Sequence, residues 1–265
     1  MALVTGAGSG IGAATARRLA ADGWRLALSG RRDGPLRAVA DELGALAIVG
    51  DAATERGAAA AVDETVRHYG RLDALVANAG VMLPGRAEEL SVDDWNETLR
   101  INLTGPFLQA RRSLDHLRRS GGAIVAVSSV GGLRAGPGAV AYSTSKAALN
   151  MLVQALAVDH ASEGVRVNAV APGWVRTEMG DEEMREFGSE RGLTVEEGYR
   201  KVTEHVPARR AAAADEIAAA IAWLLSDQAS YVNGATLAVD GGTAVADVGT
   251  IALAGQDIAV ERGAR

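Results

Sequence analysis

Tyr142 and Lys146 are the residues of this sequence whose types and spacing most directly suggest chemistry. On a helix, positions four apart lie on one face, one turn from each other, so an ammonium would lie beside a phenol. The phenol of tyrosine titrates near ~10 in water, and a neighbouring positive charge favours its ionised form. We therefore expect Tyr142 to donate and accept protons near neutral pH. Ser129, just after the apolar run 123–127, would present a hydroxyl to the same substrate oxygen.

A glycine-rich segment, residues 5–12, follows a short apolar run and precedes a helical pattern. Gly6, Gly10 and Gly12 would let the backbone turn tightly and approach a pyrophosphate, which the helix N-terminus would attract. By itself, such a loop is equally compatible with an ordinary turn. Its spacing, G-x-x-x-G-x-G, differs from the G-x-G-x-x-G of other dinucleotide folds, and the motifs downstream favour the nucleotide cradle.

Six motifs resemble, in order and spacing, those of the short-chain dehydrogenase/reductase family. They are Thr5–Gly12 as T-G-x-x-x-G-x-G, Asn78-Ala79-Gly80 as N-A-G, Asn102, Ser129 with Tyr142 and Lys146, Pro172–Thr177 as P-G-x-x-x-T, and Val239–Gly242 as V-D-G-G. One departure is Ala77, where the family more often has a second Asn. The resemblance implies a single-domain, Rossmann-like α/β fold. It also implies an NAD(P)-dependent oxidoreductase, such as a ketoreductase, that acts on a small-molecule secondary alcohol or ketone.

The resemblance further implies a role for each of four residues. Tyr142 would be the general acid in reduction and the base in oxidation, and Lys146 would lower its pKa and hold the nicotinamide ribose. Ser129 would hydrogen-bond the substrate oxygen, and Asn102 would anchor a water chain leading to Lys146. The cofactor supplies the hydride, so no metal is needed. The four histidines lack the spacing of metal ligands, and we expect no metal site.

Other residues match the family's cofactor contacts. The glycine loop would hold the pyrophosphate, and the residues after the third strand would contact the adenine. The P-G-x-x-x-T segment would bind the nicotinamide carboxamide or a phosphate. The expected cofactor-binding residues are Gly6, Ser9, Gly10, Ile11, Gly12, Arg31, Arg32, Asp51, Ala52, Asn78, Ala79, Gly80, Tyr142, Lys146, Pro172, Gly173, Val175 and Thr177.

The turn Gly30-Arg31-Arg32 bears on which dinucleotide is used. An acidic residue at the end of the second strand would bind a ribose 2′-hydroxyl, but Gly30 stands where NAD-using relatives carry Asp. Arg31 offers a planar fork that suits a 2′-phosphate, and Arg32 could take its place. A solvated basic turn is the alternative. We expect NADP to be preferred, with NAD as the second possibility.

Apolar runs alternate with helical patterns along the chain, which predicts parallel strands joined by right-handed helical crossovers. The predicted fold is therefore a doubly wound sheet with helices on both faces. The expected strands are 2–4, 24–29, 45–50, 72–77, 123–127, 165–171 and 235–239. The expected helices are 11–22, 33–43, 54–69, 91–119 with an interruption near Gly105-Pro106, a helix starting at Tyr142, and 215–225.

Two segments depart from this pattern. Residues 178–205 are rich in Asp and Glu, and the family places a variable lid over the substrate here. Short helices that close on a ligand and a solvated charged excursion are both compatible with this composition. Residues 243–265 extend beyond the family's usual length and are too apolar for a free tail. We treat residues 1–265 as one dinucleotide-binding and catalytic domain.

Composition narrows the classes of partner. The formal charge of −6 and a pI near 5.3 argue against nucleic acid or an anionic membrane surface. The absence of cysteine excludes disulfides and thiol catalysis. No signal-peptide pattern precedes the first apolar run and no run is long enough for a membrane span, so we expect a cytoplasmic protein. The helix after Tyr142 is apolar on more than one face, which indicates a homotetramer or homodimer.

Two other functions are compatible with a dinucleotide fold. An epimerase or dehydratase would keep the cofactor bound, but such relatives are longer and carry a substantial C-terminal substrate domain. A non-catalytic dinucleotide sensor typically lacks Tyr or Lys of the catalytic pair, and both Tyr142 and Lys146 are present here. The intact set of four residues favours the enzyme.

Overall fold

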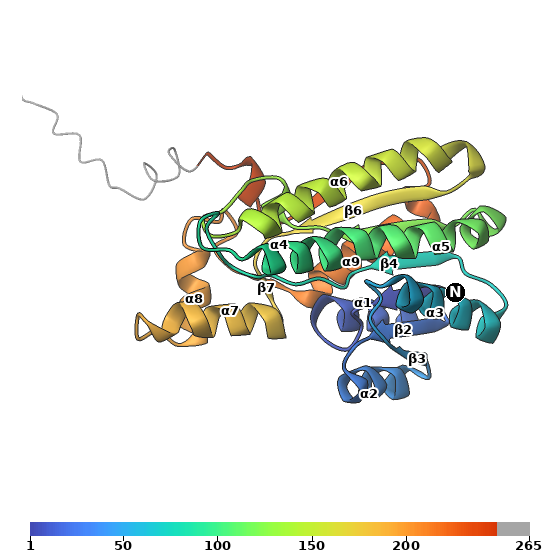
Figure 1. Cartoon of the computed structure of the whole chain (residues 1–265), viewed down its shortest axis with the longest axis horizontal. Coiled ribbons are helices and arrows are strands. Elements are labelled where there is room, and N and C mark those ends of the chain that lie inside the picture. The colour runs from blue at the N-terminus through green and yellow to red at the C-terminus, as the bar shows by residue number, and fades with distance from the viewer. Residues whose placement is uncertain (248–265) are drawn as a thin grey trace, which may run out of the picture.

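A seven-stranded, all-parallel sheet forms the centre of the computed structural model, which describes residues 1–247 (Figure 1). The strand order is β3-β2-β1-β4-β5-β6-β9, which confirms the doubly wound α/β fold. The strands are β1 (Ala2–Thr5), β2 (Leu26–Gly30), β3 (Leu46–Val49), β4 (Ala74–Ala77), β5 (Ala123–Val127), β6 (Arg166–Pro172) and β9 (Thr236–Val239). All seven expected strands are found, with ends that differ by at most two residues.

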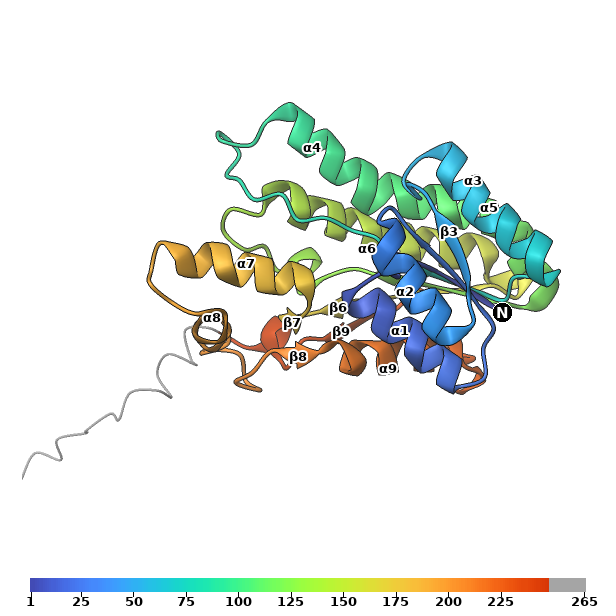
Figure 2. The ribbon, with the colours of Figure 1, turned by 90° about the horizontal axis from the view of Figure 1, so that it is seen from below.

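Helices cover both faces of the sheet, and each face has its own apolar core (Figure 2). One face carries α1 (Gly10–Ala21), α2 (Asp33–Leu43) and α9 (Ala214–Leu225). The other carries α3 (Glu55–Tyr69), α5 (Gly105–Ser120) and α6 (Val140–His160). Because the central strands are covered on both sides, β1, β4 and β5 are buried along their whole length, which explains their continuous apolar runs.

The strand order reverses between β1 and β4, so the connections after these two strands leave on opposite faces. In open α/β sheets, ligands bind in the crevice at this point, beyond the carboxyl ends of the strands. The glycine loop follows β1 there, and Asn78 follows β4. The fold therefore places these two motifs side by side.

The expected interruption of the helix at 91–119 lies earlier than Gly105-Pro106. The segment consists of α4 (Val92–Leu99), a π-helical turn η1 (Arg100–Thr104) and α5. Pro106 follows directly on helical backbone, lacks an N–H for the preceding turn, and cannot accommodate a regular α-helical carbonyl four residues earlier, so the wider turn lies just before a residue that interrupts an α-helix. The wider turn itself contains Asn102 and is of the kind often found at functional sites.

The acidic segment forms helices beyond the carboxyl ends of the strands (Figure 2). It contains α7 (Glu178–Ser189) and α8 (Val195–Val202), flanked by a parallel pair that the sequence did not predict, β7 (Val175–Arg176) with β8 (Ala212–Ala213). Met184 and Tyr199 pack together in a small separate core. The expected short helices are present in this segment, and their closure on a ligand stays a prediction. We call residues 178–205 the lid. Most of the apolar tail at 243–265 lies outside the described residues.

Gly57 lets α3 begin close beneath the loop after β3. A Cβ at this position would lie 1.9 Å from the backbone oxygen of Asp51, so the backbone would have to move. We expect Gly57→Ala to lower the free energy of unfolding by about 1–3 kcal/mol, the usual cost of overpacking. Gly34→Ala is the matched control, because a Cβ at that position would have nothing within 4 Å. Urea denaturation at one protein concentration measures both, and equal stabilities would contradict this packing.

Candidate active site

The structure brings Ser129, Tyr142 and Lys146 together at the carboxyl end of β5. Ser129 follows this strand, and α6 begins at Val140, so Tyr142 lies in its first turn. The ammonium of Lys146 lies 5.7 Å from the centre of the Tyr142 ring. The predicted neighbourhood of phenol and ammonium is therefore present.

Lys146 is a buried cation, with only 4% of its surface exposed. Its Nζ donates a hydrogen bond of 2.8 Å to the backbone oxygen of Val127. Burial lowers the pKa of Lys146 to about 8, because the dry surroundings disfavour the charged form. The ammonium is still the main form at pH 7. Besides the N–H that bonds Val127, it has further N–H groups that can donate hydrogen bonds.

The pKa of Tyr142 departs from the expectation. Burial raises it, while a hydrogen bond with Ser129 acts in the opposite direction and is outweighed. The pKa of Tyr142 is therefore raised and not lowered as expected, since removal of the phenol from water has the larger effect. The neutral phenol prevails at pH 7, and this is the form that donates a proton in reduction. Oxidation needs the phenolate, so it is favoured as pH rises.

Asn102 lies in η1 with its side chain fully engaged. Its Oδ1 accepts a hydrogen bond of 2.9 Å from the Val81 N–H, and its Nδ2 donates to the Val81 oxygen at 2.9 Å and to Ser145 Oγ at 3.1 Å. A Cβ on Gly80 would lie 3.3 Å from Asn102 Oδ1 and 3.4 Å from Lys146 Nζ. Gly80 therefore allows the segment after β4 to pack against both polar groups.

The glycine loop forms a cradle that side chains would fill. A Cβ on Gly12 would lie 2.3 Å from the Gly6 oxygen, and one on Gly6 would lie 2.9 Å from Asn78 Nδ2. Asn78 donates through the same nitrogen to the oxygens of Thr5 and Gly6, at 2.9 and 3.1 Å. The loop leads directly into α1, whose free N–H groups suit a pyrophosphate. This arrangement fits a dinucleotide.

Asp51, the expected adenine contact, is held in place before any ligand arrives. Its Oδ1 accepts from the Ala53 N–H at 3.0 Å, and its Oδ2 accepts from Arg100 at 2.9 Å. Arg100 also pairs with Glu97 at 2.6 Å, which leaves its guanidinium with two carboxylate partners. The structure thus adds Arg100 to the site, a residue that the sequence analysis did not select.

The two arginines after β2 are in different situations. Arg31 makes no hydrogen bond or ion pair within residues 1–247, and its charge acts on Glu97. Arg32 instead forms a two-pronged ion pair with Glu178 and donates to Ser9 Oγ at 2.8 Å. The basic turn therefore presents one uncommitted guanidinium and one that is already engaged.

The residues after β6 close the site. Thr177 caps α7 by accepting a hydrogen bond from the Gly180 N–H at 3.1 Å, so its hydroxyl oxygen already has a partner. Gly173 lies against Asp240, because a Cβ there would be 3.0 Å from the Asp240 Cα. Val175 is buried in the core beneath α1 and α9. The structure brings the predicted P-G-x-x-x-T residues to the same edge as the glycine loop.

Sequence reasoning missed three charged residues near the site: Arg100, Glu178 and Glu183. Glu183 is partly buried in α7 and makes no hydrogen bond or ion pair within residues 1–247. Burial and then the charge of Glu186 raise the pKa of Glu183. The Glu183 charge in turn contributes to raising the pKa of Tyr142. No local pattern marks these residues, because each acts on a group that is distant in the sequence.

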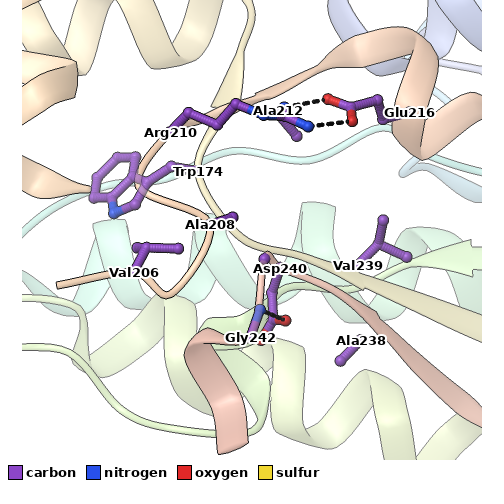
Figure 3. Close-up of a pocket in the computed structure, with 11 residues that line it drawn as sticks. Trp174, Val206, Ala208, Arg210, Ala212, Glu216, Ala238, Val239, Asp240 and Gly242 are labelled. Carbon is purple, nitrogen blue, oxygen red and sulfur yellow. Dashed lines mark hydrogen bonds and ion pairs between the residues drawn. The ribbon is translucent and has the colours of Figure 1, made fainter. Parts of the chain in front are cut away.

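A separate cavity of about 260 Å³ lies beside β8 and the end of β9 (Figure 3). Its charged groups are already satisfied: Arg210 pairs with Glu216, and Asp240 accepts from the N–H groups of Gly242 and Ala244. None of the four expected catalytic residues lines it. Within residues 1–247 there is no grouping of potential metal ligands, and no helix of that part is long and apolar enough to cross a membrane.

Comparison of the sequence with known proteins shows its relatives. Residues 6–244 match the family model described as enoyl-(acyl carrier protein) reductase. Protein MoaE of Klebsiella aerogenes is 41% identical over 95% of this chain and 98% of its own length. Glucose 1-dehydrogenase of Gluconobacter oxydans is 36% identical over 91% of this chain and 90% of its own length.

Solved structures agree with these relatives. Levodione reductase has a TM-score of 0.89 and 34% identity, covering 93% of this chain and 98% of its own. An actinorhodin polyketide ketoreductase variant with NADPH has a TM-score of 0.88 and 34% identity, covering 92% and 97%. The 3-ketoacyl-(acyl-carrier-protein) reductase of Brucella melitensis with NADH has a TM-score of 0.82 and 30% identity, covering 92% and 98%. The chain therefore belongs to the short-chain dehydrogenase/reductase family and is an NAD(P)-dependent oxidoreductase that acts on alcohols or ketones.

Proposed function

We propose that Tyr142 is the group that transfers the proton in this reaction, with Ser129, Lys146 and Asn102 as its partners. The observation that supports this role most directly is the partly buried phenol of Tyr142, which lies beside Ser129 and close to the buried ammonium of Lys146. These residues lie at the carboxyl edge of the sheet, where the glycine cradle also ends.

In the direction of reduction, the Ser129 hydroxyl donates a hydrogen bond to the substrate oxygen, and Tyr142 transfers its proton to that oxygen. The nicotinamide, when bound, supplies the hydride. Lys146 holds positive charge beside the phenol and so stabilises the phenolate that remains. Asn102 fixes the segment after β4 through Val81 and serves as the anchor of the proton relay.

The proposed cofactor preference is NADP over NAD. One of the related structures contains NADPH and another contains NADH. The proposed preference therefore rests on the turn after β2 of this chain. Gly30 offers no carboxylate to a 2′-hydroxyl and none to repel a 2′-phosphate. Arg31 makes no ion pair within residues 1–247, which leaves its planar fork available for phosphate oxygens. A reaction that consumes a diffusible nicotinamide cofactor also fits the expected cytoplasmic location.

The proposed substrate is a neutral or weakly polar carbonyl compound or alcohol. Nine acidic and four basic side chains lie in the lid, and Glu183 acts electrostatically on Tyr142. A phosphorylated substrate, or one attached to an acidic carrier protein, would meet like charge there. Glu183 without an ion-pair partner can instead accept a hydrogen bond from a substrate hydroxyl. A sugar, a steroid, a polyketide or a small ketone meets this requirement.

The proposed assembly is a homotetramer with twofold interfaces. Met151 and Val158 on α6 are 62% and 80% exposed, and Phe107 at the start of α5 is 42% exposed. On α9, Trp223 is 39% exposed. Apolar side chains on these two helical surfaces would be removed from water by pairing with the same surface of another copy.

Replacement of Tyr142 by Phe tests the proton transfer. We expect kcat to fall by about 10²–10⁴-fold, because a positioned general acid is lost. Cofactor affinity, measured by titration of the protein fluorescence, should stay within a few-fold of wild type. Tyr231→Phe is the control, since Tyr231 is fully exposed. Turnover of Tyr142→Phe close to the wild-type rate would rule out this role.

Replacement of Arg31 by Ala tests the cofactor preference. A hydrogen bond to a charged group contributes about 1.5–3 kcal/mol, so NADP should bind roughly tenfold to a hundredfold more weakly, with NAD almost unchanged. Gly30→Asp should shift the preference towards NAD. The measurement is kcat/KM with both cofactors, and equal or better use of NAD by the wild type would contradict the proposal.

Light scattering tests the assembly. We expect a tetramer mass at micromolar concentration, and Val158→Asp should produce smaller species because it places a charge in the α6 interface. Val49→Asp is a matched control, since Val49 is 44% exposed on β3, the edge strand at the opposite side of the sheet from β9. A monomer mass for the wild type would refute the tetramer.

A further inference from the structure

Arg32 and Glu178 form an ion pair between two parts of the chain that are distant in the sequence. Arg32 Nη1 donates to Glu178 Oε1 at 2.8 Å, and Nη2 donates to Oε2 at 2.6 Å. Nη2 also donates to Ser9 Oγ at 2.8 Å. The turn after β2, the glycine loop and the first residue of α7 are thus joined through one guanidinium.

This ion pair lies along the seam between the lid and the cofactor cradle. Gly10 lies against Thr177, because a Cβ on Gly10 would be 3.2 Å from the Thr177 Cβ. The start of α7 is next to the start of α1 in both views (Figures 1 and 2). The lid is therefore attached to the glycine loop at the place where the pair forms.

A phosphate group can replace Glu178 as the ion-pair partner of Arg32. Both side chains are 54% exposed, and ion pairs in such positions contribute little to stability because water and salt compete for them. A phosphate monoester carries more charge than a carboxylate and has three acceptor oxygens, so it binds a guanidinium fork more strongly. The hydrogen bond from Arg32 lowers the pKa of Glu178 to about 2, and the carboxylate is charged at every physiological pH.

We propose that Glu178 determines cofactor selectivity by competing with the 2′-phosphate of NADP for Arg32, and that this phosphate releases the start of the lid when it takes Arg32 over. The inference rests on the proposed preference for NADP. In this respect Arg32 differs from Arg31, which makes no ion pair within residues 1–247 that a phosphate would have to break.

Release at Glu178 would reach the whole lid. Tyr199 of α8 donates to Asp181 of α7 at 2.9 Å, and a Cβ on Gly198 would lie 3.2 Å from the Met184 sulfur. Because α7 and α8 are packed together, loss of the Arg32–Glu178 pair removes one of the contacts that hold both helices beside the glycine loop. A cofactor that bears the 2′-phosphate thus loosens the first turn of α7, at the edge of the site that holds Tyr142.

The test is a double-mutant cycle on Arg32 and Glu178, read by equilibrium binding of NADP and NAD. Glu178→Gln should raise the affinity for NADP about two- to fivefold, the range set by an exposed ion pair, and leave NAD unchanged. Arg32→Ala should weaken NADP, and Glu178→Gln should have no further effect in that background. Glu182→Gln is the matched control, since Glu182 lies on α7 but pairs with Arg185.

Hydrogen exchange of the α7 amides supplies a second measurement that does not depend on turnover. In the wild type, adenosine 2′,5′-bisphosphate should speed exchange in the first turn of α7 relative to 5′-AMP, and Glu178→Gln should show fast exchange without ligand. Equal exchange with both nucleotides, or additive effects in the cycle, would overturn the proposal. Loss of NADP binding in Arg31→Ala together with an additive cycle would refute only the competition between Glu178 and the 2′-phosphate. An NADP affinity no higher than that for NAD in every variant would refute the cofactor preference as well.

Discussion

The burial of one ammonium group, that of Lys146, constrains the packing of the whole site. A cation removed from water must be hydrogen-bonded, and here the backbone oxygen of Val127 at the end of β5 is its partner. The segments around it have to approach closely. A Cβ on Gly132 would lie 2.7 Å from the backbone of Lys146, and one on Gly80 would touch its Nζ. Glycine at these positions lets two loops enclose the charge.

The parallel sheet makes this arrangement available. Because all seven strands run in the same direction, the segments after β1, β4, β5 and β6 meet at one edge. Asn78 links two of them by bonding the backbone of the glycine loop, and Asn102 supports the segment after β4 from the π-helical turn. These side chains bind backbone groups that loops would otherwise leave unpaired, so they position the site before a ligand binds.

Charge is distributed unevenly around this edge. Near the proposed adenosine site, Arg100 holds Asp51 and Glu97, while Arg31 has no ion pair within residues 1–247. Just before the lid, Arg176 of β7 pairs with Glu196 and lies over the Tyr199 ring, which joins β7 to α8. Four carboxylates of the lid pair with cations of the lid itself, and Glu178 and Glu196 pair with arginines outside it. Glu183 is partly buried, makes no ion pair within residues 1–247, and acts on Tyr142.

Local patterns in the sequence determined the elements and the family, and they predicted the main site residues. Apolar runs mark the strands because each is buried on both faces, and the i,i+4 spacing places Tyr142 and Lys146 on one helix face. The tertiary structure decided what depends on distant neighbours. The position of the π-helical turn, the rise of the Tyr142 pKa by burial, the Asp51–Arg100 pair and the Arg32–Glu178 pair all arise from contacts between segments far apart in the chain. Burial and long-range charge pairing have no local signature, so only the folded chain shows which of the two arginines after β2 is engaged.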